Sequence, residues 1–238
     1  MPSPPFARVR PALLGIFLAM TGILSAAPVI NEIHYNNDVN YIANEFVEIY
    51  NPGPDLVNLS GWQLTGGVEF TFPDNTLLGV DDYVAVAENP TTLRAEFSRP
   101  PNGPPLDLPI LGPYTGGLSG EGETIDLVND SGERIDRVNF DVDFPWPIAA
   151  DGEGSSMELI NPSLDNNLGS SWRSSNTNGS LSPPTPGVVN SVFSSVAPPN
   201  IRQVRHLPQQ PANSEDTVIT AKVTDPDGIG GVNLEYAL

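Results

Sequence analysis

The chain has 238 residues, with ten Lys and Arg against 29 Asp and Glu, and a formal net charge of −19. So acidic a surface repels phosphate backbones, which excludes sequence-independent binding to nucleic acid. Cysteine is absent, which excludes disulfides, thiolate zinc sites and a cysteine nucleophile. Proline (26) and glycine (22) are abundant, but 39% of the residues are apolar, so the composition favours turn-rich β structure over disorder.

Residues 1–27 have the three parts of a secretory signal peptide. Arg8 and Arg10 supply the charge, residues 12–24 are apolar, and residues 25–27 are small. The apolar run is shorter than the ~20 residues that a spanning helix needs. We therefore expect cleavage after Ala27 or one residue earlier, and no membrane span afterwards. The mature chain would be secreted or at the cell surface, with eight bases against 29 acids and a net charge near −21.

Short strand patterns separated by turn residues begin directly after this segment. In residues 45–51, Val47 and Ile49 fall on one face, and Phe46, Glu48 and Tyr50 fall on the other. Trp62 and Leu64 share a face of the next strand, which places Trp62 in the core. Residues 83–87 are almost continuously apolar and predict a central strand.

The second half of the domain continues the same pattern. Residues 124–128 alternate, residues 129–132 (NDSG) predict a turn, and residues 134–140 predict the hairpin partner. Residues 156–160 predict a further strand, and residues 91–97 predict at most one helical turn. Two irregular segments complete the domain: residues 98–112 predict a loop, and residues 164–186 predict an extended wrap fixed by Trp172.

The motifs EFVEIYN, GWQL, FTFP and YVAVAEN follow one another between residues 45 and 89, after VINEIHYNN at residues 29–37. Together with ADGEGSSMELINP (150–162) and PTPGVVN (184–190), they resemble a lamin-tail domain of the exported bacterial type. The resemblance covers residues 28–193. It implies an all-β fold, an immunoglobulin-like antiparallel β-sandwich. The chain has an export signal and no heptad rod, so filament assembly is not implied.

Residues 194–200 (SSVAPPN) predict a linker, and residues 201–238 predict a partial second β unit. Its alternating segment, residues 216–228, resembles the first strands of an immunoglobulin-like module. Two strands cannot bury an apolar face alone. We therefore expect the sequence to be a fragment, with residues 201–238 a truncated module.

Catalytic motifs are absent from the sequence, so we predict no catalytic, cofactor-binding or metal residue and no enzyme activity. His34 and His206 lack metal-ligand partners at familiar spacings. Residues 115–122 are glycine-rich but lead into a strand, so they predict a turn and not a phosphate loop.

The remaining candidates for a functional site are carboxylates. Asp141 and Asp143 would approach Asp151 and Glu153 if the intervening Pro-Trp-Pro turns back, and residues 225–228 (DPDG) look like part of a calcium loop. Asp227 and its neighbours lack the remaining ligands of a full loop. We therefore expect turn roles for these acids, and calcium binding that is weak at most.

Three functions fit these observations. The first is an exported, non-catalytic β-sandwich that binds or spaces at the cell surface, with an unknown protein or glycan as its ligand. The second is the N-terminal accessory region of a larger secreted enzyme, for example a hydrolase or one with a spore-coat kinase-like domain. The third is a carbohydrate-binding sandwich that uses Tyr35, Tyr41 or Trp146 as exposed aromatic residues.

Overall fold

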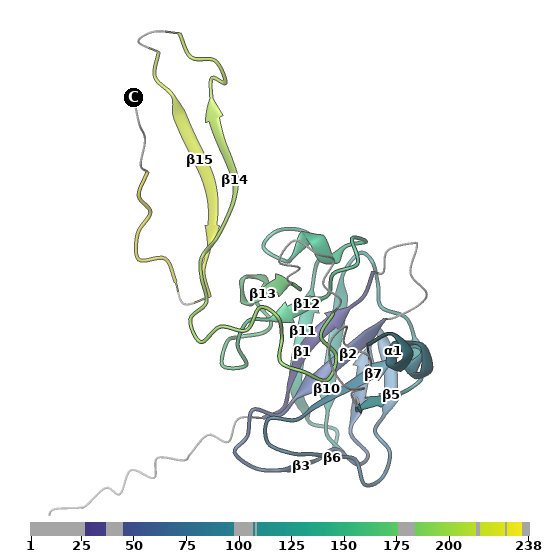
Figure 1. Cartoon of the computed structure of the whole chain (residues 1–238). Helices are drawn as coiled ribbons and strands as arrows, with labels where there is room; N and C mark the ends of the chain where they lie inside the picture. Colours follow the sequence, from purple (N-terminus) through teal and green to yellow (C-terminus); the bar gives the residue numbers. More distant parts are fainter. Residues whose placement is uncertain are drawn as a thin grey trace, which may run out of the picture.

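A computed structural model describes residues 27–36, 45–97, 107, 109–175, 184–212, 215–226 and 228–234. The predicted signal segment therefore lies outside the described residues, apart from Ala27. Two sheets pack face to face to form a sandwich (Figure 1). The predicted fold class, an all-β immunoglobulin-like sandwich, is confirmed.

The first sheet has six strands, and all its neighbours are antiparallel except the last pair. Their order is β13 (Trp172–Ser174), β12 (Met157–Leu159), β1 (Val29–His34), β2 (Phe46–Tyr50), β7 (Tyr83–Ala87) and β8 (Ile110–Leu111). The order brings together strands from both ends of the domain, because β1 lies between β2 and β12.

The second sheet has five strands in the order β11 (Arg134–Phe140), β10 (Glu123–Val128), β4 (Gln63–Gly66), β5 (Val68–Thr71) and β9 (Thr115–Gly116). A short pair, β3 (Val57–Asn58) and β6 (Leu77–Leu78), forms beside it. The predicted β10–β11 hairpin is confirmed, with Ile125 opposite Val138.

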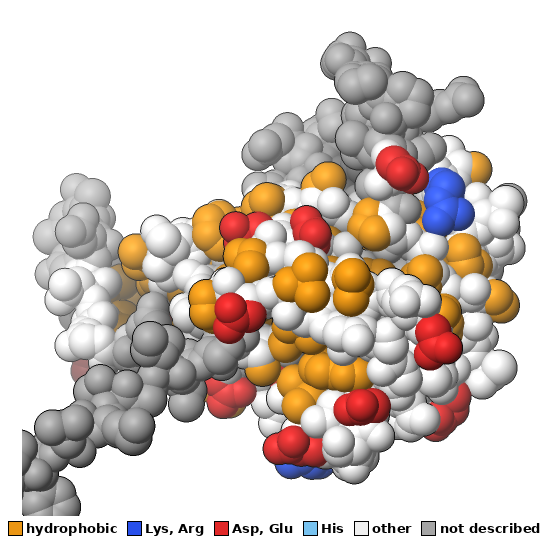
Figure 2. All heavy atoms as spheres, turned by 90° about the horizontal axis from the view of Figure 1, so that it is seen from below, with side chains coloured by type: hydrophobic (Ala, Val, Ile, Leu, Met, Phe, Trp, Pro, Cys, Tyr) orange, Lys and Arg blue, Asp and Glu red, His pale blue; other side chains and the backbone are white. Residues whose placement is uncertain are grey.

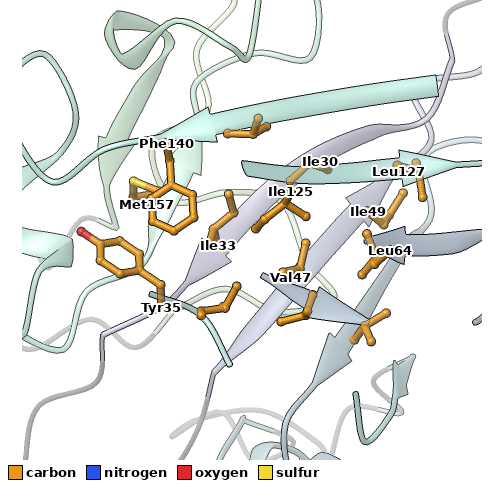
Figure 3. Packing of buried hydrophobic residues seen from close by; sticks show 14 of the residues in the cluster. Ile30, Ile33, Tyr35, Val47, Ile49, Leu64, Ile125, Leu127, Phe140 and Met157 are labelled. Atoms are coloured by element: carbon orange, nitrogen blue, oxygen red, sulfur yellow. The ribbon is translucent and has the colours of Figure 1, made fainter. Parts of the chain in front are cut away.

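Apolar side chains from the inner faces of both sheets fill the space between them (Figure 3). Val47 and Ile49 face this core, as their alternation predicts, and Ile125 and Leu127 enter it from the opposite sheet. Full burial of a side chain of this size contributes about 1.5–3 kcal/mol. Alternation in strands from both halves of the domain therefore specifies one common core.

A helix covers the outer face of one end of the first sheet. The single predicted turn is instead α1 (Pro90–Phe97), which buries Leu93 against Phe46 and Ala87. The side chain of Asn89 caps it by accepting a hydrogen bond from the Thr92 N–H at 3.1 Å, and proline is favoured at a helix start. The helix explains the apolar run of β7, which is buried on both faces. No described helix has the length and apolarity needed to cross a membrane.

The end of the sandwich differs from the sequence prediction for two tryptophans. Trp172 is fully buried as expected, and its Nε1–H donates to the carbonyl oxygen of Asn166 at 2.8 Å. Trp146, assigned to an exposed turn, is only 7% exposed and lies against Trp172 with ring centroids 6.2 Å apart. Trp62 does face the core, but it is only partly buried. The preference for Trp62 over Trp146 as a core residue was therefore wrong.

A close approach between chain segments explains the burial of Trp146. A Cβ atom at Gly169 would lie 2.9 Å from both the backbone nitrogen and the Cγ atom of Trp146. Gly169 begins the turn η2 (Gly169–Ser171), which leads into β13. The segment after residue 164 thus contains a turn and a strand. Because Gly169 has no side chain, this segment can pass close over Trp146.

The last described strands, β14 (Asn200–Leu207) and β15 (Val218–Thr224), pair with each other as a hairpin that stands away from the sandwich (Figure 1). Apolar side chains such as Val204 and Leu207 are 63% and 65% exposed. The predicted second β unit is confirmed as this hairpin, and the domain boundaries around it stay a prediction.

Candidate functional site

The carboxylates singled out in the sequence lie in turns. Oδ1 of Asp141 accepts the N–H groups of Val142 and Asp143 at 2.7 and 3.1 Å, the geometry of an Asx turn. Oδ1 of Asp151 accepts the side-chain N–H of Asn36 at 2.7 Å. Both aspartates lie near Tyr35, where burial and then the charges of Asp151 and Asp141 raise the pKa of the phenol. The structure thus brings Asp141 and Asp151 toward one tyrosine.

These carboxylates do not assemble a metal centre. Within the part of the chain that the structure describes, no group of three or more His, Asp or Glu residues is placed to hold a metal ion. Asp225 lies in a turn closed by the N–H of Gly228 at 3.2 Å, and Asp227 lies outside the described residues. The glycine-rich segment leads from β9 into β10, as expected. Weak calcium binding stays a prediction.

The two histidines occupy different environments. His34 is buried at the end of β1, with its ring edge-on to Phe46 at 5.8 Å. His206 is exposed on β14, where Nδ1 lies 3.2 Å from the carbonyl oxygen of Pro208.

The proposed exposed aromatic platform is contradicted for both of its described members. Tyr35 is 1% exposed and packs on Phe140 at 4.9 Å, and Trp146 is 7% exposed; Tyr41 lies outside the described residues. In Figure 3, Tyr35 lies with Phe140 and Met157 at the edge of the labelled core cluster. The carbohydrate-binding hypothesis therefore loses the aromatic residues on which it was based.

A row of three buried glutamates crosses the outer face of the first sheet. Glu32 on β1 is the register partner of Glu158 on β12 and of Glu48 on β2. All three are 0% exposed. They are named here the glutamate row. Strand alternation places them opposite the apolar core, on the face where the sequence predicts solvent.

A bulge in β1 adds an amide beside the row. The register shifts between Ile30 and Glu32, so Asn31 has no strand partner. Its side chain donates to Oε1 of Glu48 at 3.0 Å and to Oδ1 of Asn190 at 2.8 Å. The Ile30 N–H donates to Asp136 on the opposite sheet at 2.6 Å. The bulge therefore turns two consecutive polar side chains, Asn31 and Glu32, to the outer face.

Residues 184–193, named here the strap, cover the glutamate row. The N–H of Thr185 donates to Oε1 of Glu32 at 2.9 Å, and the N–H of Gly187 donates to Oε2 of Glu48. The Ser191 hydroxyl and the Val192 N–H donate to Oε2 of Glu158 at 2.8 and 3.1 Å. All three glutamates thus accept hydrogen bonds from the strap.

Two further side chains complete the closure. The Ser156 hydroxyl donates to Oε1 of Glu32 at 2.6 Å. The side chain of Asn190 donates to the carbonyl oxygens of Asn31 and Leu159 at 3.1 and 2.8 Å. Asn190 therefore bridges β1 and β12 by their backbones.

Basic side chains do not offset this buried charge. Among the described residues, no Lys or Arg forms an ion pair with the glutamate row; Arg137 pairs with Asp126. Arg173 is the strand partner of Glu158, but its guanidinium donates to the carbonyl oxygens of Ser170, Trp172 and Pro198. Carboxylates buried without a cation favour their protonated form.

The acidity of the row follows from this environment. Burial raises the pKa of Glu48 to about 8, against the lowering effect of the donors Gly187 and Asn31. Burial raises the pKa of Glu32, and the charges of Glu158 and Glu48 raise it further. The pKa of Glu158 is raised by burial, against the lowering effect of Ser191 and Thr185. Desolvation therefore outweighs the hydrogen bonds at all three positions.

A hollow of about 110 Å³ lies next to the strap. Tyr50 and Tyr83 form part of its lining, with their rings stacked at 4.6 Å. The Tyr50 hydroxyl donates to Asp81 at 2.8 Å, and burial followed by that bond raises its pKa to about 12. The strap contributes Val189, Asn190 and Phe193 to the lining.

The glutamate row was not predicted from the sequence. Its signal was a single glutamate within each of three apolar strands, in the segments INEIH, FVEIY and SMELI. An acid on the outer face of a strand ordinarily faces water, so the pattern alone predicts solvation. The burial depends on the strap, which arrives from 139 residues away at Glu48 and 153 residues away at Glu32.

The family model of the lamin tail domain matches residues 25–141. Glu32 and Glu48 lie inside the matched range, whereas Glu158 and the strap lie beyond it. No curated protein matches the chain.

Proposed function

The chain belongs to the lamin tail domain family through residues 25–141, and from this premise we propose that it is an exported, non-catalytic β-sandwich that binds a ligand or acts as a spacer at the cell surface or outside the cell. The family supports a sandwich module without a catalytic role. Export rests on the signal-like pattern of residues 1–27.

One observation carries the non-catalytic role. Carboxylates that lie side by side are the usual means of acid–base chemistry, and the glutamate row is a place where described carboxylates meet on neighbouring strands. All three are sealed from solvent, and their oxygens accept hydrogen bonds from the domain's own strap. The row therefore serves to close the domain, because no substrate reaches it.

The hollow beside the strap is the place where a ligand would bind. It combines the stacked, half-buried rings of Tyr50 and Tyr83 with the exposed ring of Phe193. Asn31 and Asn190 add polar groups to the lining. At about 110 Å³ the hollow is smaller than pockets that enclose a whole ligand, so we propose that a single neutral ring, such as a sugar ring, stacks on its aromatic wall. Figure 2 shows acidic side chains scattered among apolar ones on the face seen from below, and the formal net charge of −19 disfavours anionic ligands.

Binding is tested by sedimentation of the mature chain with insoluble cellulose, chitin and peptidoglycan. We expect retention on at least one polymer, reduced by Tyr83→Leu and kept by Tyr83→Phe, because the proposed contact is stacking of the ligand on the aromatic ring. Retention that Tyr83→Leu leaves unchanged would move the ligand away from the hollow. No retention of the wild type on any polymer would favour a spacing role.

Export is tested by expressing the full chain with its own N-terminus in a bacterial host. The protein outside the cytoplasm is expected to begin at Pro28 or Ala27, which N-terminal sequencing reads directly. Recovery of the chain from the cytoplasm with residues 1–27 intact would contradict the exported part of the proposal.

A further inference from the structure

The strap bridges two glutamates through a single hydroxyl group. Oγ1 of Thr185 lies 3.2 Å from Oε2 of Glu32 and 2.8 Å from Oε1 of Glu158. A threonine hydroxyl has one proton to donate. It can therefore donate to one carboxylate only, and the contact with the other is a hydrogen bond only when that carboxyl group carries a proton.

We propose that the strap is a proton-dependent latch, closed when Glu32 and Glu158 share one proton through the hydroxyl of Thr185 and released as that proton is lost. The ionised pair would place two negative charges against one hydroxyl, with one contact lacking a hydrogen. In the singly protonated pair, one carboxyl donates to Thr185 and Thr185 donates to the other.

The titratable and charged groups that face the pair are few, and they include His34, two residues from Glu32 on the outer face of β1 and edge-on to Phe46. The strap itself, with the sequence PTPGVVNSVF, has no ionisable side chain. β2 contributes Glu48 and Tyr50, and β7 contributes Tyr83, whose pKa burial raises first and the charge of Glu48 raises further. β13 contributes Arg173, which donates to backbone carbonyls. Besides His34 and Arg173, these strands and the strap contain no basic side chain that could replace the lost proton.

The direction of the pH dependence follows from the shifts. The carboxyls of the row have raised pKa values in the closed state, so that state binds protons more tightly than the open one. Closure is fully favoured below the ordinary glutamate value near 4.5, and this stabilisation is lost as pH rises through the raised values, about 8 for Glu48. The strap should therefore be closed at pH 5 and weakened at pH 9.

Release of the strap would also change the hollow. Val189, Asn190 and Phe193 lie in the strap, whereas Tyr50 and Tyr83 belong to the sheet. Loss of the strap removes one part of the lining and leaves the stacked tyrosines in place. The latch thereby links the protonation of a buried site to the shape of a surface site.

Amide hydrogen exchange of the full chain, resolved by residue, tests the latch. The N–H groups of Thr185 and Val192 donate directly to the pair, so their protection factors report closure. We expect these factors to fall at least about tenfold between pH 5 and pH 9. A difference of one pKa unit between the closed and the open state changes the closing equilibrium by this amount. Leu127, in the second sheet, should keep its protection.

Glu158→Gln separates the shared proton from a general effect of pH. The amide supplies a permanent N–H to Thr185, which can then donate to Glu32, while the amide oxygen accepts from Ser191 and Val192. Closure is expected to persist at pH 5, and the tenfold fall at Thr185 and Val192 should be largely lost. Glu69→Gln, at an exposed position on β5, is the matched control and should retain the wild-type fall.

Three results would overturn the latch. The first is wild-type protection that is equal at pH 5 and pH 9. The second is an unchanged fall in Glu158→Gln. The third is loss of the strap or of the fold in Glu158→Gln at pH 5, which would show that the carboxyl is not held in a form that an amide can replace.

Discussion

Replacement of Trp172 by alanine is expected to lower the free energy of unfolding by about 3–5 kcal/mol. The side chain is 0% exposed, lies against Trp146 and donates to the carbonyl oxygen of Asn166. Its removal leaves a large cavity at the end of the core and one buried carbonyl without its donor. Urea denaturation followed by circular dichroism measures the loss.

Trp62 provides the matched comparison, because it contacts the same core but is only partly buried. Trp62→Ala should lower the free energy of unfolding by less than either Trp172→Ala or Trp146→Ala. A greater loss for Trp62→Ala than for Trp146→Ala would restore the assignment that the sequence alone suggested and contradict the packing of Trp146 described here.

Gly66→Ala is expected to destabilise the sandwich by about 2–5 kcal/mol, from the combined cost of strain and overpacking. Gly66 ends β4 with φ +110°, where a side chain is strained. A Cβ atom there would lie 2.1 Å from the carbonyl oxygen of Thr124 on the neighbouring strand. Since that neighbour is backbone, β4 and β10 would have to move apart.

Gly132→Ala isolates the contribution of the backbone conformation. Gly132 also has a left-handed φ, +81°, but nothing lies within 4 Å of its added Cβ. Gly132→Ala should lower the free energy of unfolding by only about 1–2 kcal/mol, which is the cost of the backbone strain alone. Equal losses in the two variants, measured by denaturation, would show that the close contact between β4 and β10 contributes little.

Strand positions could be predicted from sequence where alternation is strong and the partner is local. The β10–β11 hairpin is an example, because the turn NDSG joins two alternating runs and Ile125 lies opposite Val138 as a result. The order of the first sheet could not be predicted in this way. It pairs β1 with β12, which joins Glu32 to Glu158 across most of the domain.

The glutamate row shows why sequence reasoning failed at the site. Alternation correctly separated Glu48 from Val47 and Ile49, but the pattern does not reveal what covers an outer face. The covering strap contains two prolines and one glycine among its ten residues, a pattern typical of a loop. The prediction that Trp146 is exposed was wrong for the same reason. Its flanking prolines indicate a turn, whereas its burial depends on Gly169 and Trp172.

The side-chain carboxyl resonances of the full chain, labelled with ¹³C at glutamate and titrated from pH 3 to pH 10, report directly whether the glutamate row is protonated. We expect at least one of Glu32, Glu48 and Glu158 to be still protonated at pH 6, above the ordinary titration range of glutamate, and we expect Glu158→Gln to remove one late-titrating carboxyl. Ionisation of every glutamate by pH 6, with the strap still protected from exchange, would contradict this expectation.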